Sequence, residues 1–309
     1  MRIAVVGAGG VGGYFGARLA EAGEEIVFIA RGAHLDALRR SGLRIESPRG
    51  NARLGPQRAT DDPREIGPVD AVLLCVKTWQ VAEVAASIQP LIGPDTGVVP
   101  FQNGVEAADE VIAALGPGPV LGGVAKIVAF VAAPGVIRDL GGPTAAAFAE
   151  LDNRPSARVE RLRDAFRGAR LEVETPADIQ AAVWSKFLFV ASAGGVGAVA
   201  RMPIGVLRRV PETRRLLAGG MTEIAALARA RGVRLPDDIV GRTMAFADTL
   251  PADGTASLQR DIAEGRRSEL DWWSGAVVRL GREAGVATPV HAFIYDSLLP
   301  SELHARGLL

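Results

Sequence analysis

One lysine stands alone in an apolar stretch. Residues 180–200 read QAAVWSKFLFVASAGGVGAVA, and Lys186 is the single charged side chain among them. Burying an ammonium group is costly unless it is paired or gives up its proton. Apolar neighbours favour release of that proton, so Lys186 is a candidate proton donor that could also attract an anionic substrate.

Two other roles for Lys186 stay open. A Schiff-base lysine also favours an apolar setting, and a buried lysine can form a structural ion pair. The histidines offer no better acid: His34 lies close behind Arg31, His291 falls in a late helix, and His304 is in the tail. The sequence therefore gives no support to a His–Asp proton relay.

A glycine loop follows the first apolar segment. Gly7, Ala8, Gly9, Gly10, Val11 and Gly12 contain the pattern G-x-G-x-x-G, directly after an expected strand and at the start of an expected helix. Such glycines allow a tight turn and let a pyrophosphate approach the backbone amides at the positive end of the helix. This order of elements favours dinucleotide binding over a glycine-rich turn that binds nothing.

Further polar residues stand where strands are expected to end. Arg31 follows the second strand, where an NAD site usually carries an acidic residue, and a guanidinium there can clamp a 2′-phosphate. Lys77, Gln80 and Asn103 follow the next two strands, at the edge where ligands of doubly wound sheets gather. The sequence predicts NADP rather than NAD; a solvated arginine and loop-surface roles for the other three are the alternatives.

The pattern of elements changes midway along the chain. Continuous apolar strands over residues 2–7, 25–30, 70–76 and 96–101 alternate with helical segments, which predicts a parallel sheet covered on both faces. Residues 120–131 and 135–142 look like antiparallel strands at the edge of that sheet. From residue 176 the apolar spacing is helical throughout, including 211–232, 235–250, 268–285 and 289–299. We expect an α/β Rossmann-type domain over 1–176 and an all-α substrate and catalytic domain over 177–309.

Composition excludes several classes of protein. The 35 basic and 35 acidic residues balance, so no strong field favours nucleic acid or a membrane surface. A single cysteine, Cys75, permits no internal disulfide or cysteine-based zinc site and suits a reducing cytoplasm. We expect Cys75 to be a small core residue, and the apolar segment around Lys186 to be a buried helix rather than a membrane span. The glycine-rich start does not read as a signal peptide.

Several motifs together resemble one enzyme family. GAGGVG, the AR after the second strand, VKTWQ, QNG, WSKF, SLQRDI and SELDWWSG are ordered and spaced as in the 2-dehydropantoate 2-reductases, also called ketopantoate reductases. The resemblance spans essentially the whole chain. It implies an NADPH-binding Rossmann domain joined to a helical domain, and reduction of ketopantoate to pantoate in pantothenate biosynthesis.

The resemblance also assigns roles to residues. It makes Lys186 the catalytic lysine, Asn103 a contact to cofactor and substrate, and Lys77 a cofactor-side lysine. It makes Ser257 a substrate-binding serine, and Glu269 a carboxylate near the nicotinamide ribose and the lysine. No metal is implied.

The chain departs from the family at its substrate-binding asparagines, which correspond here to Val190, Gly194 and Ile204. Two alternatives follow: a paralogue that reduces a more apolar 2-oxo acid, and an NADPH-binding regulator without catalysis. Retention of the lysine, Asn103, Ser257 and Glu269 disfavours the regulator. Apolar C-terminal helices make a homodimer an expectation.

Overall fold

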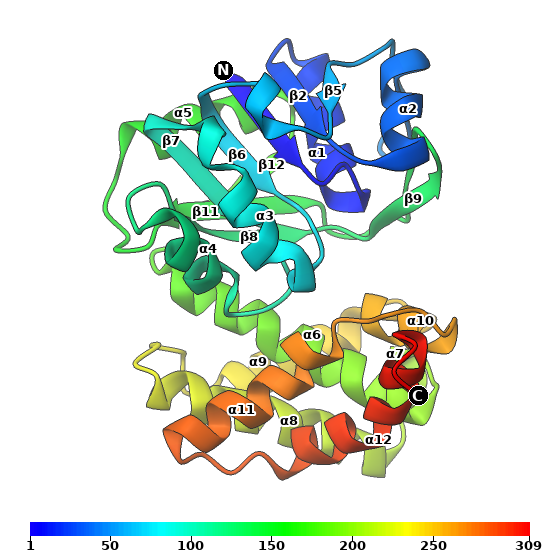
Figure 1. The fold of residues 1–309 in the computed structure, drawn as a ribbon. Helices are drawn as coiled ribbons and strands as arrows, with labels where there is room; N and C mark the ends of the chain where they lie inside the picture. Colours follow the sequence, from blue (N-terminus) through cyan, green and yellow to red (C-terminus); the bar gives the residue numbers. More distant parts are fainter. The chain divides into compact units, whose positions relative to one another are not determined.

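A computed structural model describes residues 1–309, which form two compact units (Figure 1). The first contains Met1–Gln102 and Glu106–Ile179, and the second contains Asn103–Val105 and Gln180–Leu309. The chain thus changes unit close to the boundary expected at residue 176. The short segment Asn103–Val105 belongs to the second unit, although the residues on both sides of it belong to the first. A prediction with a single domain boundary cannot describe this arrangement.

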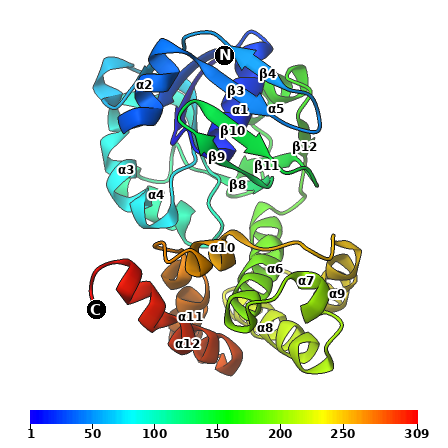
Figure 2. The same cartoon turned by 90° about the vertical axis from the view of Figure 1, so that its right-hand side faces the viewer.

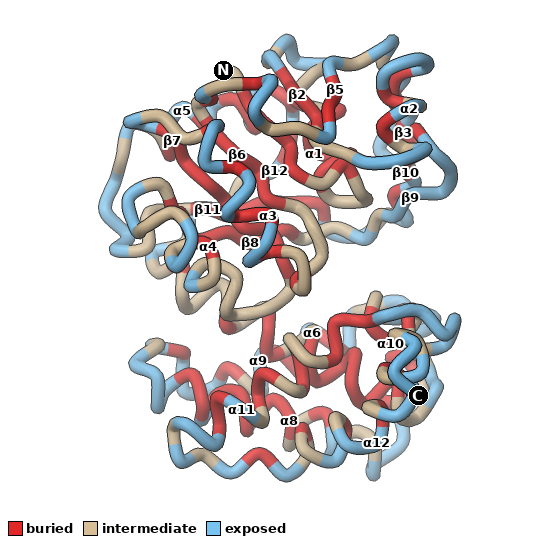
Figure 3. Tube along the Cα trace, in the orientation of Figure 1, coloured by how far each residue is buried: buried red, intermediate tan, exposed pale blue.

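A five-stranded parallel sheet is the centre of the first unit, in the order β5-β2-β1-β6-β7. Its strands are β1 (Arg2–Val6), β2 (Glu25–Ile29), β5 (Ala59–Thr60), β6 (Val69–Leu74) and β7 (Ile92–Pro100). Figure 3 shows these strands largely buried. The prediction of a parallel α/β sheet is confirmed.

Two apolar clusters cover the two faces of this sheet. Ile3 and Val5 of β1 point to one face, and Ala4 and Val6 point to the other, because successive side chains of a strand alternate. The first face packs against α1 (Gly10–Glu21) and α5 (Ala157–Gly168), and the second against α3 (Val81–Ser87) and α4 (Ala107–Leu115) (Figure 2). The short α2 (Gly32–Arg40) joins β2 to the next strands.

The strands expected at the edge of the parallel sheet build two smaller sheets. One has the order β4-β3-β10-β9 and the other the order β12-β11-β8. Their members are β3 (Leu43–Glu46), β4 (Ala52–Leu54), β8 (Leu121–Lys126), β9 (Ala129–Ala133), β10 (Val136–Asp139), β11 (Ala145–Glu150) and β12 (Glu172–Glu174).

An isolated parallel bridge from Val98 of β7 to Val120, directly before β8, places the start of β8 at the edge of the parallel sheet, as expected. The prediction was wrong for β9 and β10, which join a different sheet, and only partly right about direction. β9–β10 and β8–β11 are antiparallel, but β3–β10 and β11–β12 are parallel. The physical reason is that β10 and β11 take their other partners from β3 and β12. Those strands are too short to be recognised from their own sequence, and each lies far from its partner along the chain.

The second unit is entirely helical, as predicted. Its helices are α6 (Ile179–Ala200), α7 (Ile204–Leu207), α8 (Pro211–Ala230), α9 (Ile239–Thr249), α10 (Ser257–Ala263), α11 (Ser274–Ala284) and α12 (Pro289–Ala305). The helix expected from residue 268 begins only at Ser274. Before it, Leu270–Trp272 form one 3₁₀ turn, and the Leu270 N–H donates to the Ser268 hydroxyl.

α6 carries the apolar stretch that includes Lys186. By length and composition alone it could cross a membrane. Trp184, Phe187, Leu188 and Ala191 of this helix are buried in the core of the helical unit. α6 is thus a core helix of this unit.

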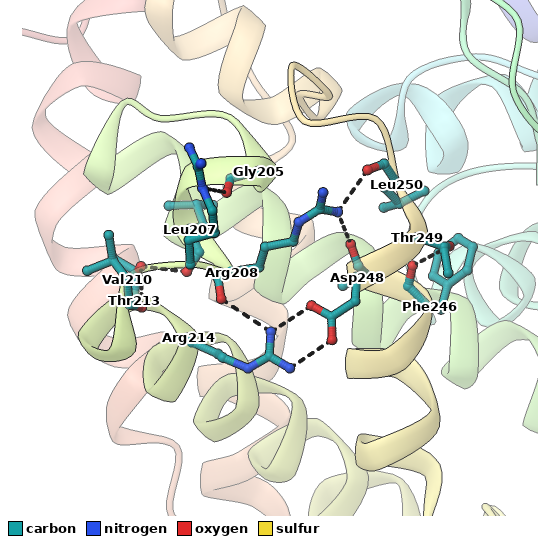
Figure 4. Close-up of polar contacts among 12 residues, drawn as sticks. Gly205, Leu207, Arg208, Val210, Thr213, Arg214, Phe246, Asp248, Thr249 and Leu250 are labelled. Carbon is teal, nitrogen blue, oxygen red and sulfur yellow. Dashed lines mark hydrogen bonds and ion pairs between the residues drawn. The ribbon is translucent and has the colours of Figure 1, made fainter.

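Polar contacts tie α7, α8 and α9 together on the surface of this unit (Figure 4). Arg214 donates two hydrogen bonds to the Asp248 carboxylate, at 2.7 and 2.8 Å. Arg208 donates to the carbonyls of Ala247 and Leu250 at the end of α9. These bonds satisfy carbonyl groups that the helix terminus leaves without partners.

Candidate active site

The glycine loop leaves room for a ligand on one side only. Gly7 has φ +93° and its N–H donates to the Ile29 carbonyl at 2.9 Å. A Cβ at Gly12 would lie 2.2 Å from the Gly7 carbonyl oxygen, whereas a Cβ at Gly9 would meet no protein atom within 4 Å. The loop is therefore closed against the protein at Gly12 and open at Gly9, directly before the N-terminus of α1.

This loop fits the pyrophosphate of a dinucleotide. Because α1 begins at Gly10, its first amides and its positive dipole end lie beside the open position at Gly9. Ala8 is buried, and Val11 packs against the core of the unit, so neither side chain obstructs the opening. Burial raises the pKa of the Cys75 thiol behind the loop, which fits a packing residue and not a nucleophile.

Arg31 lies at the position expected for a 2′-phosphate contact. It is exposed directly before α2, and its guanidinium makes no hydrogen bond or ion pair. An arginine without a protein partner at the end of β2 can take a phosphate without breaking an existing bond. The residues of the first unit thus fit an NADP molecule.

The end of β6 holds the other residues expected on the cofactor side. The Lys77 ammonium lies 5.6 Å from the centre of the Trp79 ring. The Gln80 side-chain oxygen accepts a hydrogen bond from the Lys77 N–H at 3.2 Å, so this oxygen shapes the turn. Both residues are half-buried at the carboxyl end of the sheet.

The sequence interpretation missed Gln102. Its amide nitrogen donates to the Leu74 and Val76 carbonyls, both at 3.0 Å, and its buried oxygen has no partner. Gln102 therefore fixes the end of β6 beside Asn103. The signal was present in the motif QNG, where only the asparagine was selected.

The second unit contains the four residues expected to act on the substrate. Lys186 is half-buried on α6, and Asn103 lies in the segment whose Val105 packs against the helical core. Ser257 is the first residue of α10. Glu269 is 6% exposed, and its carbonyl accepts the N–H groups of Trp272 and Trp273. No cluster of His, Cys, Asp or Glu in the chain could hold a metal ion.

Trp273 fills the space beside Gly194, where the resemblance to the family implies an asparagine. A Cβ at Gly194 would lie 2.7 Å from Cζ3 of the Trp273 ring and 3.2 Å from the Ala256 Cβ. An asparagine cannot be placed at residue 194 unless the indole moves.

The other two departures differ from each other. Val190 is half-buried and packs against the helical core. Ile204 is buried in that core at the start of α7, where its N–H donates to the Gly254 carbonyl. Ile204 therefore packs in the core of the helical unit.

Comparison with known proteins identifies the family of this chain. The family described as "Ketopantoate reductase PanE/ApbA" matches residues 3–153, and its C-terminal domain matches residues 178–301. A 2-dehydropantoate 2-reductase from Mesorhizobium japonicum is 30% identical, with 94% of each chain covered. An uncharacterized oxidoreductase from Bacillus subtilis is 28% identical, covering 96% of this chain and 98% of its own.

Solved structures give the same result. A PanE/ApbA family ketopantoate reductase from Ralstonia eutropha is 31% identical, with a TM-score of 0.89, 99% of this chain covered and 100% of its own. A D-mandelate dehydrogenase solved with NADH and anilino(oxo)acetate has a TM-score of 0.90 at 22% identity, with 99% of both chains covered, and thus shares the fold. The chain belongs to the ketopantoate reductase family and is an NADP-dependent oxidoreductase that acts on CH–OH groups.

Proposed function

We propose that this enzyme reduces 2-dehydropantoate to pantoate with NADPH, as a step of pantothenate biosynthesis in the cytoplasm. The observation that carries the proposal is the joint presence of a fitted cofactor loop in one unit and of Lys186, Asn103, Ser257 and Glu269 in the other. A protein that only bound NADPH would need the first set alone. Full-length membership in the family supports ketopantoate over other 2-oxo acids.

The four residues divide the work of a carbonyl reduction. NADPH, when bound, supplies a hydride to the carbonyl carbon. Lys186 donates the proton to the carbonyl oxygen, and as a cation it attracts the substrate carboxylate. Asn103 and Ser257 offer hydrogen bonds that orient the substrate, and Glu269 holds the lysine in place.

The cofactor side follows from the first unit. The glycine loop and the N-terminus of α1 bind the pyrophosphate, and Arg31 binds the 2′-phosphate. Lys77 and Gln80 approach the ribose or nicotinamide from the end of β6. Asn103 follows Gln102, whose two hydrogen bonds hold the backbone at this point.

A second candidate function is reduction of a more apolar 2-oxo acid. The observation in its favour is the Trp273 ring packed against Gly194, at a position where the resemblance to the family implies an asparagine. A site that loses hydroxyl-binding amides loses selectivity for a hydroxylated substrate. On this view, ketopantoate is still reduced, but with a smaller advantage over an analogue that lacks the hydroxyl.

The test compares kcat/KM for ketopantoate and for 2-oxo-3,3-dimethylbutanoate, which lacks the hydroxymethyl group, by following NADPH oxidation. We expect both to be reduced, with a preference for ketopantoate well below about 10⁴-fold, the level reached by sites built around a hydroxyl. Reduction of the analogue alone would establish the apolar substrate class. NADPH binding without oxidation by any 2-oxo acid would contradict both and indicate a regulator.

A further inference from the structure

The loop that carries Glu269 is tied to α12 by a buried carboxylate. Glu302, near the end of α12, is 1% exposed. Its Oε2 accepts the backbone N–H of Ser268 at 2.9 Å and the Ser268 hydroxyl at 2.5 Å. Its Oε1 accepts the Arg306 Nε at 2.6 Å. The residue immediately before Glu269 is therefore fixed by the last helix of the chain.

The same helix holds the loop on the other side of Glu269. Arg306 Nη2 donates to Asp271 Oδ2 at 2.6 Å, and the Tyr295 hydroxyl donates to Asp271 Oδ1 at 2.9 Å. The guanidinium thus bridges Glu302 and Asp271. We call Glu302, Arg306 and Tyr295 the α12 clamp.

The clamp is held together by charge. Burial alone would lower the pKa of Arg306, but its hydrogen bonds to Asp271 and Glu302 raise it overall, so the guanidinium stays charged between two carboxylates. Burial and the bond to Asp271 also raise the pKa of the Tyr295 hydroxyl, which keeps its proton and its donor role. An apolar contact could join α12 to the loop without the desolvation penalty of ions. The hydrogen bonds between charged groups are instead directional, so each of them fixes the position of one atom of the loop.

We propose that Glu302 is a positioning residue for the reaction, which acts through Glu269. It holds Ser268 while Arg306 holds Asp271, so that the backbone around Glu269 has one conformation. This inference rests on the proposed function, in which Glu269 holds the catalytic lysine, and on the family resemblance, which implies that Glu269 lies near the nicotinamide ribose. None of the clamp residues needs to touch substrate or cofactor.

The direct test is Glu302→Gln, which keeps the size of the side chain but has one acceptor oxygen instead of two. That oxygen cannot serve both Ser268 and Arg306, and the new NH₂ group faces donors. We expect kcat to fall by about 10- to 100-fold, the scale of an angstrom-sized displacement in an active site. KM for the 2-oxo acid should change much less.

A double-mutant cycle separates positioning from a general loss of stability. In a Glu269→Gln background, adding Glu302→Gln should lower kcat by less than about threefold, because the group that it positions has already been altered. A merely structural Glu302 would lower kcat by the same factor in both backgrounds. That additive result would overturn the proposal.

Glu223→Gln is the matched control. Glu223 is also a buried carboxylate, and it accepts the N–H groups of Val290 and His291 at the opposite end of the same helix. Its hydrogen bonds go to α12 and not to the Ser268–Asp271 loop. This variant should leave kcat within about twofold of the parent, and its effect should add to that of Glu269→Gln.

Failure of the inference can be told from failure of the proposed function. If Glu269→Gln alone leaves turnover and NADPH affinity unchanged, Glu269 is not at the site and both ideas fall. If Glu269→Gln acts but the cycle is additive, only the clamp proposal fails. If the parent reduces no 2-oxo acid, the same cycle measured on the Kd for NADPH gives the decision, since Glu269 is proposed beside the ribose.

Discussion

The two units differ in which groups are proposed to contact the ligands: mainly backbone groups in the first unit and side chains in the second. In the first unit the surface proposed to bind the cofactor is mostly backbone: the loop at Gly7–Gly12, the first amides of α1 and the ends of β2 and β6. In the second unit the residues proposed to act on the substrate do so through side chains, and the loop that carries Glu269 is tied to α12 by the bonds of Glu302 to Ser268 and of Arg306 to Asp271. A backbone site is specified locally, and a side-chain site is specified by the whole fold.

Both units bury polar side chains, among them Gln102 and Asp139 in the first. The sheet of the first unit is covered by apolar residues on both faces. The helical unit buries Glu223, His291, Ser274 and Glu302 among its helices. Each has hydrogen-bond partners, because an unpaired buried polar group is expensive. The following experiments test whether the helical unit depends on such groups while the first depends on glycine.

The largest expected effect concerns His291 in the helical unit. Its ring lies between the Ser274 hydroxyl and the Gly220 carbonyl, both at 3.2 Å, and burial lowers its pKa to about 4 from the usual 6.5. Between these values the unfolded chain binds a proton that the folded chain does not. The free energy of unfolding should therefore fall as pH drops from 6.5 to about 4, by roughly 3 kcal/mol from this group.

Denaturant unfolding at several pH values, in the parent and in His291→Gln, checks this. The difference in unfolding free energy between the two should shrink as pH falls, and taking that difference removes the opposite contribution of Glu223, whose pKa burial raises. His304→Gln at the exposed end of α12 is the control and should show no such trend. A constant difference across the pH range would mean that burial does not lower the pKa of His291.

The glycine loop offers a paired test in the first unit. Gly12→Ala places a methyl group 2.2 Å from the Gly7 carbonyl oxygen and should lower the free energy of unfolding by about 1–3 kcal/mol, the usual effect of overpacking. Gly9→Ala meets no protein atom and should leave stability unchanged while it weakens NADPH binding. Thermal unfolding and NADPH titration of both variants give the answer. Unchanged NADPH affinity in Gly9→Ala would place the pyrophosphate elsewhere.

A smaller effect is expected at Arg31. Arg31→Ala should weaken NADPH binding by on the order of tenfold and leave NADH binding unchanged, because only NADPH carries the 2′-phosphate. Titration with both cofactors measures this, with the exposed Arg40 of α2 as the control position. Equal affinity of the parent for NADH and NADPH would refute the role of Arg31.

The contrast between the units also decides what sequence can predict. The parallel sheet follows from continuous apolar strands, and the glycine loop from its spacing, because both are local patterns. The pairing of β10 with β3 was missed, since it depends on residues far apart. In the helical unit the sequence indicates Lys186 and Glu269 as candidates, but not the contact of Trp273 with Gly194 or of Glu302 with Ser268. Those contacts exist only once several helices have packed.

The central claim is that the first unit binds the cofactor and the helical unit supplies the chemistry. Lys186→Ala tests it most directly, with the Kd for NADPH and the rate of a single turnover measured on the same sample. We predict an NADPH Kd within about twofold of the parent and a turnover rate lower by about 10²-fold or more, the scale for loss of a positioned acid. A near-normal rate at saturating substrate, or a loss of NADPH binding as large as the loss of rate, would contradict the account.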